Sequence, residues 1–474
     1  MANLWVKKSI VSLLAQAADS EKGLKRTLGA VNLVALGIGA IIGAGLFVRT
    51  AAASSQAAGP AVTISFIVAA IGCAFAGLCY AEFAAMIPIA GSAYTYAYAT
   101  MGEFIAWIIG WALVLEYALG AVTVSIAWSE YLNKLLNGAI PFEWCHSPFE
   151  GGILNLPALL ILFLLTLLLI KGTEESASVN AIIVFIKVAI VLIFIAVGYQ
   201  FINPANHTPY LMPQGPGHME WNKWGYGGIL GGAAIVFFAF IGFDAVSTAA
   251  QEAKNPAKDM PIGILGSLVV CTILYVLFSY VLTGVANYTE FATAGKEASV
   301  AYAITNHMPG YGWLSTAVTV AILAGFSSVI LVMLLGQSRV FYTMSTDGLI
   351  PKVFSELHPK FRTPFKSNWI LLVFSGILAS FLPGSMAGDL TSFGTLLAFV
   401  LVSLGIWLLR RSDPDQPRPF KTPLVPLVPI LGALICSAMI IALDKYTLLT
   451  AMGWMAIGIL IYFGYSKKNS KLQE

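Results

Sequence analysis

The first long apolar segment of this chain carries four glycines within nine residues. The run from Gly37 to Phe47 reads Gly-Ile-Gly-Ala-Ile-Ile-Gly-Ala-Gly-Leu-Phe. Glycine in a helix interior costs about 1 kcal/mol relative to alanine. A helix that breaks within lipid must also find other partners for its released backbone groups. A break at mid-membrane therefore predicts a helix whose free amides and carbonyls hold a solute, as in secondary transporters.

The groups released at two such breaks have opposite chemistry. Amides at the start of a half-helix suit a carboxylate, and carbonyls at the end of one suit an ammonium group. A zwitterionic α-amino acid fits both, whereas glycine-mediated helix packing is the competing explanation for the glycines. The predicted backbone ligands are the amides of Gly43, Ala44 and Gly45 and the carbonyls of Ile41, Phe238, Ala239 and Ile241.

Four ionisable residues lie within expected membrane spans: Glu82, Glu116, Lys187 and Asp244. A charge at mid-bilayer costs about 2.5 to 3.5 kcal/mol on insertion scales, so each needs a partner or a function. Asp244 follows the second break and could bind a cationic side chain, join a gate or take part in proton coupling. Glu116 could approach it from the third span, and Glu82 is expected to pair within an inner gate. A buried lysine such as Lys187 can release a proton in the physiological range, and a permanently charged structural pin is the alternative.

Composition indicates a membrane protein. Of 474 residues, 58% are hydrophobic and 10% charged, against roughly 25% charged in soluble domains, and the mean hydropathy is +0.82. A span needs about 20 apolar residues, which predicts about twelve helices. They cover approximately 31–52, 61–86, 104–131, 156–170, 179–199, 227–250, 262–285, 314–340, 369–382, 390–409, 424–443 and 448–465.

Basic residues fall mostly on one side of this arrangement. With the N-terminus inside, twenty of the 26 lysines and arginines lie in cytoplasmic loops and tails, as the positive-inside rule requires. Five are expected outside: Arg49, Lys134, Lys223, Lys296 and Lys445. Both tails are basic, which favours an even number of spans and two cytoplasmic termini. The first residues lack the apolar core of a signal peptide and are expected to form a short interfacial helix or a solvated tail.

A weak internal repeat organises the chain. Gly43 precedes Pro60 by 17 positions and Gly242 precedes Pro261 by 19, so two glycine-interrupted spans each open a five-helix stretch. This sequence pattern is typical of inverted repeats with a binding site at their interface. Chance similarity between glycine-rich segments is the alternative. We therefore expect a cytoplasmic segment at 1–30, one transporter domain at 31–466 and a cytoplasmic tail at 467–474. Within the domain, repeat one covers about 31–200, repeat two about 227–410, and two accessory helices about 424–466.

Recognisable motifs lie in order along nearly the whole chain. The first broken span carries Ile-Ile-Gly-Ala-Gly-Leu-Phe from Ile41, and the sixth carries Phe-Phe-Ala-Phe-Ile-Gly-Phe-Asp-Ala-Val-Ser from Phe237. The others are 79–82, Pro88 with Gly91 and Tyr94, 115–117, Glu252, 255–256, 260–261, 337–339 leading to 347–348, and 418–420. As an ordered set they resemble the cationic amino acid transporter family of the amino acid–polyamine–organocation superfamily.

This resemblance implies a leucine-transporter-like fold in which helices 1 and 6 unwind around the substrate, with Phe238 as an outer gate. It also implies that Lys187 occupies the position of a sodium ion and contacts the Gly43 carbonyl and the hydroxyls of Ser327 or Ser328. Two departures bear on substrate preference: Ala44 replaces a common Ser or Thr, and Ala112 stands where relatives often carry Asp.

The combined prediction is a multi-pass permease of the plasma membrane, in contact with the lipid bilayer. It would move a cationic or small neutral L-α-amino acid by proton-coupled, sodium-independent alternating access. An exchanger without proton coupling is the alternative, and a channel or an intramembrane enzyme is disfavoured because a ringed pore lining and an intramembrane histidine are missing from the sequence pattern. The five cysteines show no disulfide or metal spacing, and neither a cofactor nor a nucleic acid partner is expected.

Overall fold

The computed structural model describes residues 4–10, 13, 28–87, 92–172, 177–213, 220–248, 250, 253–293 and 298–473. Over these residues the chain is helical, apart from turns, loops and one isolated β-bridge between Leu28 and Ala253. The motif residues Pro88, Gly91 and Glu252 and most of the expected interfacial helix lie outside the described residues. An all-helical membrane protein is the architecture that the composition predicts.

Long apolar helices make up most of the described chain. Seven stretches are long and apolar enough to cross a membrane, and five shorter apolar helices accompany them in the described residues. The shorter ones are α2 (Ala30–Ile41), α8 (Leu156–Lys171), α10 (Gly225–Val236), α15 (Phe365–Phe381) and α17 (Leu427–Ile441). The long ones include α4 (Val62–Met86), α9 (Ala177–Gly198), α12 (Pro256–Val285), α14 (Gly312–Thr346), α16 (Gly384–Ser412) and α18 (Lys445–Ile461). The remaining long stretch joins α6 (Glu103–Val114), the π-helical turn η4 (Leu115–Leu119) and α7 (Gly120–Leu135).

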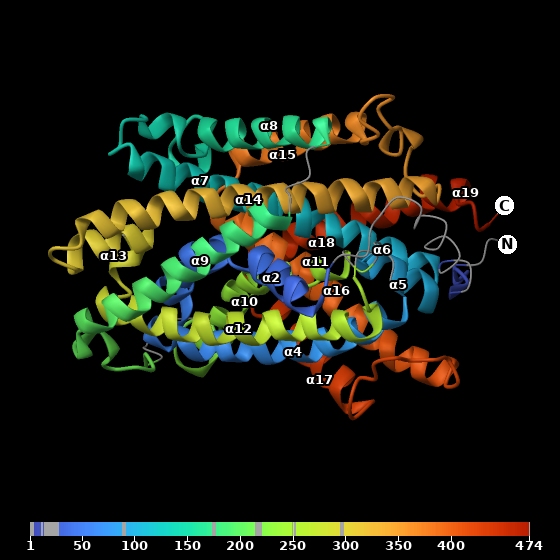
Figure 1. Ribbon diagram of the computed structural model, residues 1–474, viewed down its shortest axis with the longest axis horizontal. Coiled ribbons are helices and arrows are strands. Elements are labelled where there is room, and N and C mark those ends of the chain that lie inside the picture. The colour runs from blue at the N-terminus through green and yellow to red at the C-terminus, as the bar shows by residue number, and fades with distance from the viewer. Residues whose placement is uncertain are drawn as a thin grey trace.

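Two groups of helices lie side by side along the long axis of the molecule (Figure 1). In one group α12 packs along both α4 and α2, and α10 packs on α4. In the other group α14 packs on α7, and α15 on α8. Helix α9 contacts α2, α12 and α14, and α16 contacts α4, α6, α7 and α17. Therefore α9 and α16 connect the two groups.

Both ends of the described chain meet at one end of the helices, on the right in Figure 1. The Lys8 ammonium forms an ion pair with Asp347, which follows α14. The buried Glu103 carboxylate accepts hydrogen bonds from Tyr462 at 3.0 Å and from Gln473 at 2.7 Å. The two termini therefore lie at the same end of the helices.

Several helix limits differ from the sequence expectation. Helix α14 continues to Thr346 and α16 begins at Gly384, so both extend beyond the expected spans. Two short helices, α5 (Ser92–Thr100) and α13 (Ser299–His307), lie where loops were expected. Arg49, which the sequence places on the outer side, is not turned to solvent: its side chain is 3% exposed and ion-paired with Asp389.

Candidate functional site

The first helix breaks within the glycine run. Helix α2 ends at Ile41, and Ile42 has an extended backbone with φ −72° and ψ 105°. The chain resumes as the π-helical turn η1 (Gly45–Arg49). The Gly43 carbonyl accepts the amides of Leu46 at 3.2 Å and Phe47 at 3.4 Å. Amides in the first turn of a helix have no acceptor within it, so Ala44 and Gly45 begin a half-helix of the kind that binds anions.

The second break has the opposite polarity. Helix α10 continues into the 3₁₀ turn η9 (Phe237–Phe240), which contains the predicted ligands Phe238 and Ala239. Ile241 is extended, with φ −61° and ψ 135°. Gly242 has φ +112°, and the short helix α11 (Ala245–Thr248) follows. Because the chain leaves the helix here, carbonyls at the end of η9 lose their partners in the next turn.

The two breaks touch through their backbones. A Cβ atom on Gly45 would lie 2.1 Å from the Ala239 Cα, and one on Gly242 would lie 2.9 Å from the Ala40 carbonyl oxygen. Neither approach leaves room for a side chain. Gly242 additionally needs the positive φ that only glycine adopts at low cost. These glycines therefore let the backbones of the two breaks lie in direct contact.

A tyrosine that the sequence analysis missed joins the same two breaks. The Tyr275 hydroxyl, from α12, lies 2.9 Å from the Ile41 carbonyl oxygen and 2.9 Å from the Ala239 carbonyl oxygen. A hydroxyl has one proton and donates it to one of these acceptors at a time. Its side chain is fully buried. The presence of a tyrosine inside a predicted membrane span was the sequence signal that could have identified Tyr275.

Lys187 reaches the first break from α9. Its ammonium donates to the Gly39 carbonyl at 2.8 Å, one turn before the expected partner Gly43. The break explains this bond, because the carbonyls of the last helical turn lack intrahelical donors and attract cations. The alkyl stem packs against Gly325 of α14, where an added Cβ would lie 2.8 Å from the Lys187 Cε. Lys187 therefore connects α9 to both α2 and α14.

The two expected serines lie on α14, one turn of helix from Gly325. The Ser327 hydroxyl donates to the Leu323 carbonyl of its own helix at 2.9 Å. Ser328 is buried, with 4% of its side chain exposed. Ser327 thus makes the local bond that serines commonly make inside helices.

Two buried carboxylates, Glu116 and Asp244, lie close enough to interact electrostatically. Both are 0% exposed. Glu116 belongs to the π-helical turn η4, and Asp244 lies between the second break and α11. The Tyr117 hydroxyl donates to Asp244 Oδ2 at 3.1 Å. Such a pair of acids next to a broken helix can exchange protons or receive a cationic group.

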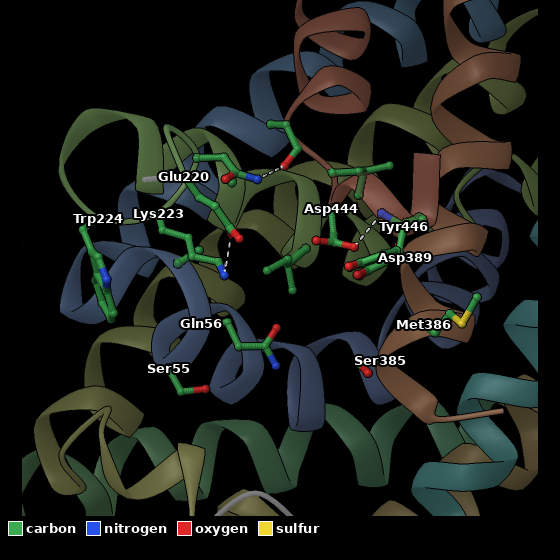
Figure 2. Close-up of a pocket in the computed structure, with 17 residues that line it drawn as sticks. Ser55, Gln56, Glu220, Lys223, Trp224, Ser385, Met386, Asp389, Asp444 and Tyr446 are labelled. Atoms are coloured by element: carbon green, nitrogen blue, oxygen red, sulfur yellow. Dashed lines mark hydrogen bonds and ion pairs between the residues drawn. The ribbon is translucent and has the colours of Figure 1, made fainter. Parts of the chain in front are cut away.

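A cavity of about 560 Å³ lies near the start of α16 (Figure 2). Its wall includes Asp389, which pairs with the Arg49 guanidinium from η1. Arg49 also donates to the carbonyls of Ile235 in α10 and Ser385 in α16, each at 3.4 Å. A smaller cavity of about 210 Å³ is lined by both Arg49 and Ala44, and so leads to the first break. The ion pair therefore lies between the two cavities and ties both broken helices to α16.

The sequence analysis missed this ion pair. Arg49 follows the glycine run directly, and Asp389 immediately precedes an apolar run. Both residues adjoin a predicted span, and this was the signal that the sequence offered. Their pairing could not be predicted, because the two residues are 340 positions apart in the sequence.

The sequence profile of the amino acid permease family matches residues 28–462. The chain is 46% identical to a branched-chain amino acid permease, BcaP, of Bacillus subtilis, over 100% of this chain and 99% of the relative. It is 40% identical to a methylthioribose transporter of the same organism, over 100% of both. A vacuolar cationic amino acid transporter of Arabidopsis thaliana is 35% identical, over 88% of this chain and 68% of the relative.

The contact between the two breaks generates a test with a matched control. In Gly45→Ala the new methyl group meets backbone at 2.1 Å, whereas in Gly43→Ala it meets the Val329 side chain at 3.2 Å. We expect Gly45→Ala to separate the half-helices and abolish detectable solute binding, with a destabilisation of about 1 to 3 kcal/mol. Gly43→Ala should weaken binding far less. The measurement is the melting temperature of each purified variant with and without added amino acid. Equal behaviour of the two variants would contradict the close packing of the breaks.

Proposed function

Because the chain belongs to the amino acid permease family, we propose that it is a secondary active transporter that carries an L-α-amino acid by alternating access. One observation carries this proposal: the two broken helices touch through their backbones at Gly45 and Ala239, where each helix releases backbone groups. Amides near Gly45 would bind the carboxylate, and the carbonyls of Ile41, Phe238 and Ala239 would bind the ammonium group. The Ile41 and Ala239 carbonyls lie beside the Tyr275 hydroxyl, which the ammonium group would displace or join.

The proposed architecture is the leucine-transporter-like fold with twelve spans. It comprises a five-plus-five inverted repeat, two accessory helices (α17 and α18) and cytoplasmic termini. The seven long and five shorter apolar helices support that number. Two broken helices in equivalent places, α2–η1 and α10–α11, support the repeat. The basic segments at both ends of the chain support the orientation.

For the substrate we propose an amino acid with a branched aliphatic side chain, with a cationic side chain as the alternative. The full-length similarity to a branched-chain amino acid permease supports the first, and so do the apolar neighbours of the breaks, Phe238, Phe240 and Phe278. The carboxylates of Asp244 and Glu116 support the alternative, because they could receive a cationic group.

A second candidate substrate comes from the similarity to a methylthioribose transporter, which extends over both full chains. A thiosugar has no carboxylate and no ammonium group. It would therefore leave the helix-end charges at the two breaks unused, which is why we place it second.

Arg49 and Asp389 form the proposed outer gate. The pair joins η1 and α10 to α16, and it borders a cavity that leads to Ala44. Closing this contact would separate the substrate from the outer solution, and opening it would admit the substrate.

Lys187 is the proposed coupling group. Its ammonium binds the carbonyl of Gly39 and its stem packs on α14, so the residue bridges the first helix and the eighth. Losing the proton would weaken that bridge and let the helices move apart. A tethered ammonium in this place would also replace a sodium ion.

The substrate proposal is tested by counterflow in liposomes loaded with each candidate amino acid. We expect saturable exchange of L-leucine, L-isoleucine and L-valine, or of L-arginine and L-lysine, and no exchange of the D-enantiomers. The reason is that the backbone ligands at the breaks read the α-amino and carboxylate groups together. Exchange of methylthioribose with no L-amino acid exchanged would contradict the amino acid site and favour the second candidate.

Lys187 substitutions test the coupling. Lys187→Ala removes the bridging charge but leaves the backbone ligands, so pH-driven uptake should fall to background while counterflow persists. Lys187→Arg should also fail, because arginine does not lose its proton in proteins. Lys258→Ala, at an exposed position at the start of α12, is the control and should keep wild-type uptake. The measurement is uptake under an acid-outside gradient, with and without sodium.

Sodium-dependent uptake, or full pH-driven uptake by Lys187→Ala, would move the coupling role to Glu116 and Asp244. Loss of counterflow along with uptake in Lys187→Ala would instead indicate that the lysine is a structural pin.

A further inference from the structure

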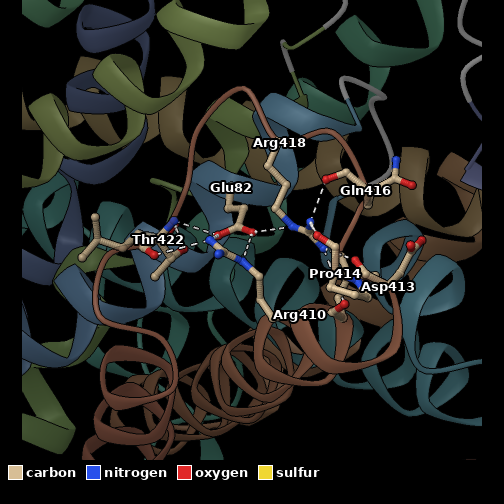
Figure 3. Close-up of polar contacts among 9 residues, drawn as sticks. Glu82, Arg410, Asp413, Pro414, Gln416, Arg418 and Thr422 are labelled. Atoms are coloured by element: carbon tan, nitrogen blue, oxygen red, sulfur yellow. Dashed lines mark hydrogen bonds and ion pairs between the residues drawn. The ribbon is translucent and has the colours of Figure 1, made fainter.

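Glu82 is a fully buried carboxylate near the end of α4 (Figure 3). The Arg410 guanidinium, at the end of α16, donates to both of its oxygens, at 2.8 and 2.9 Å. The backbone amide of Thr422 donates to Glu82 Oε2 at 2.7 Å. Two parallel bonds between a guanidinium and a carboxylate fix both distance and orientation. Glu82 therefore holds α4 to the end of α16.

A second arginine completes the cluster. The Arg418 Nε lies 3.2 Å from Glu82 Oε1, and the Arg418 side chain is 3% exposed. Its terminal nitrogens donate to the carbonyls of Pro414 at 2.9 Å, Gln416 at 2.6 Å and Asp413 at 2.5 Å. Residues 413–422, here named the strap, are thus wound around Arg418 between α16 and α17 (Figure 3).

The strap is also fixed directly to α4. The Thr422 hydroxyl donates to the Leu78 carbonyl at 3.1 Å, one turn of α4 before Glu82. With the amide of Thr422 on the carboxylate, one residue of the strap makes two bonds to the same helix. Cutting the Glu82 contacts would therefore free the end of α16 and leave only the Thr422 hydroxyl among these bonds between the strap and α4.

The ion pair at the other end of α16 is built differently. Asp389 and Arg410 are about 32 Å apart along the helix axis, at opposite ends of α16. Asp389 pairs with one guanidinium among the described residues, that of Arg49. The Asp389 side chain is 15% exposed, beside the cavity of about 560 Å³. Glu82 has two guanidinium partners and is 0% exposed.

The two ion pairs should therefore respond differently to a change of conformation. Water in the cavity of about 560 Å³ can solvate Asp389 when Arg49 moves away. The ion pair between Arg49 and Asp389 can therefore open. Separating Glu82 from its arginines would leave a buried charge without a counter-charge, which proteins tolerate poorly. We propose that Glu82 is a positioning residue that makes the inner end of α16 a fixed hinge on α4, so that α16 moves relative to α4 only at its outer end. This inference rests on the proposed alternating access.

Distances between spin labels test the hinge. One pair of introduced cysteines replaces Ser412, at the inner end of α16, and Lys258, at the start of α12, which packs along α4. The other pair replaces Ser385, at the outer end of α16, and Ile64 of α4. All four positions are exposed, and the native cysteines are buried. With and without substrate, the inner distance should stay the same and the outer distance should shift.

Substitutions in the cluster give the second readout. Glu82→Gln should broaden the inner distance distribution and lower the maximal transport rate at least tenfold, while KM stays within about threefold. Arg410→Lys keeps the charge and loses the two-bond geometry, so a smaller fall is expected. Glu356→Gln, which removes an exposed ion pair with Lys366, is the control and should transport at the wild-type rate.

Three outcomes would overturn the hinge: an inner distance that shifts with substrate in wild-type protein, Glu82→Gln transport at the wild-type rate, or loss of transport with an unbroadened inner distance. If Glu82→Gln does not fold, the distances in wild-type protein and the transport rate of Arg410→Lys still test the hinge. Counterflow by the wild-type protein is measured in the same liposomes. Its absence would contradict the proposed function, whereas a moving inner distance in active protein would contradict the hinge alone.

Discussion

The absence of water in the hydrocarbon core is the constraint on which this structure depends, because every released backbone group must find a partner in protein or solute. The chain breaks two helices at Ile42 and Ile241 and brings the breaks into backbone contact through Gly45 and Gly242. Tyr275 supplies one hydroxyl to two of the released carbonyls. The two breaks thus share partners for their released groups, and the proposed zwitterion site lies where they meet.

The buried charges extend the same constraint to the rest of the molecule. Lys187 takes a carbonyl released by the first break. Arg49 joins both broken helices to the outer end of α16, and Glu82 joins α4 to its inner end. Each of these three side chains thus connects elements that would move or stay together in the proposed alternating access. Burial of the carboxylate decides which contacts can open, since Asp389 borders a cavity and Glu82 is 0% exposed.

Local features of the sequence predicted much of this. The apolar runs predicted the helices, and glycine density predicted both breaks, because lipid burial and helix propensity act over short stretches of chain. The partners of Arg49, Lys187 and Glu82 could not be predicted, because each bond joins distant segments and depends on how the helices pack. Lys187 is an example. The family resemblance implied a contact with Gly43, on the correct helix, but the position of the break determined that the free carbonyl is that of Gly39.

The central claim is that the two breaks bind the substrate through their backbones. An experimental structure of the protein with its transported amino acid bound tests this most directly. The account predicts the carboxylate within hydrogen-bond distance of the amides of Gly43 to Gly45, and the ammonium group at the carbonyls of Ile41 and Ala239. A substrate bound elsewhere, with Tyr275 still on both carbonyls and the breaks unoccupied, would contradict it.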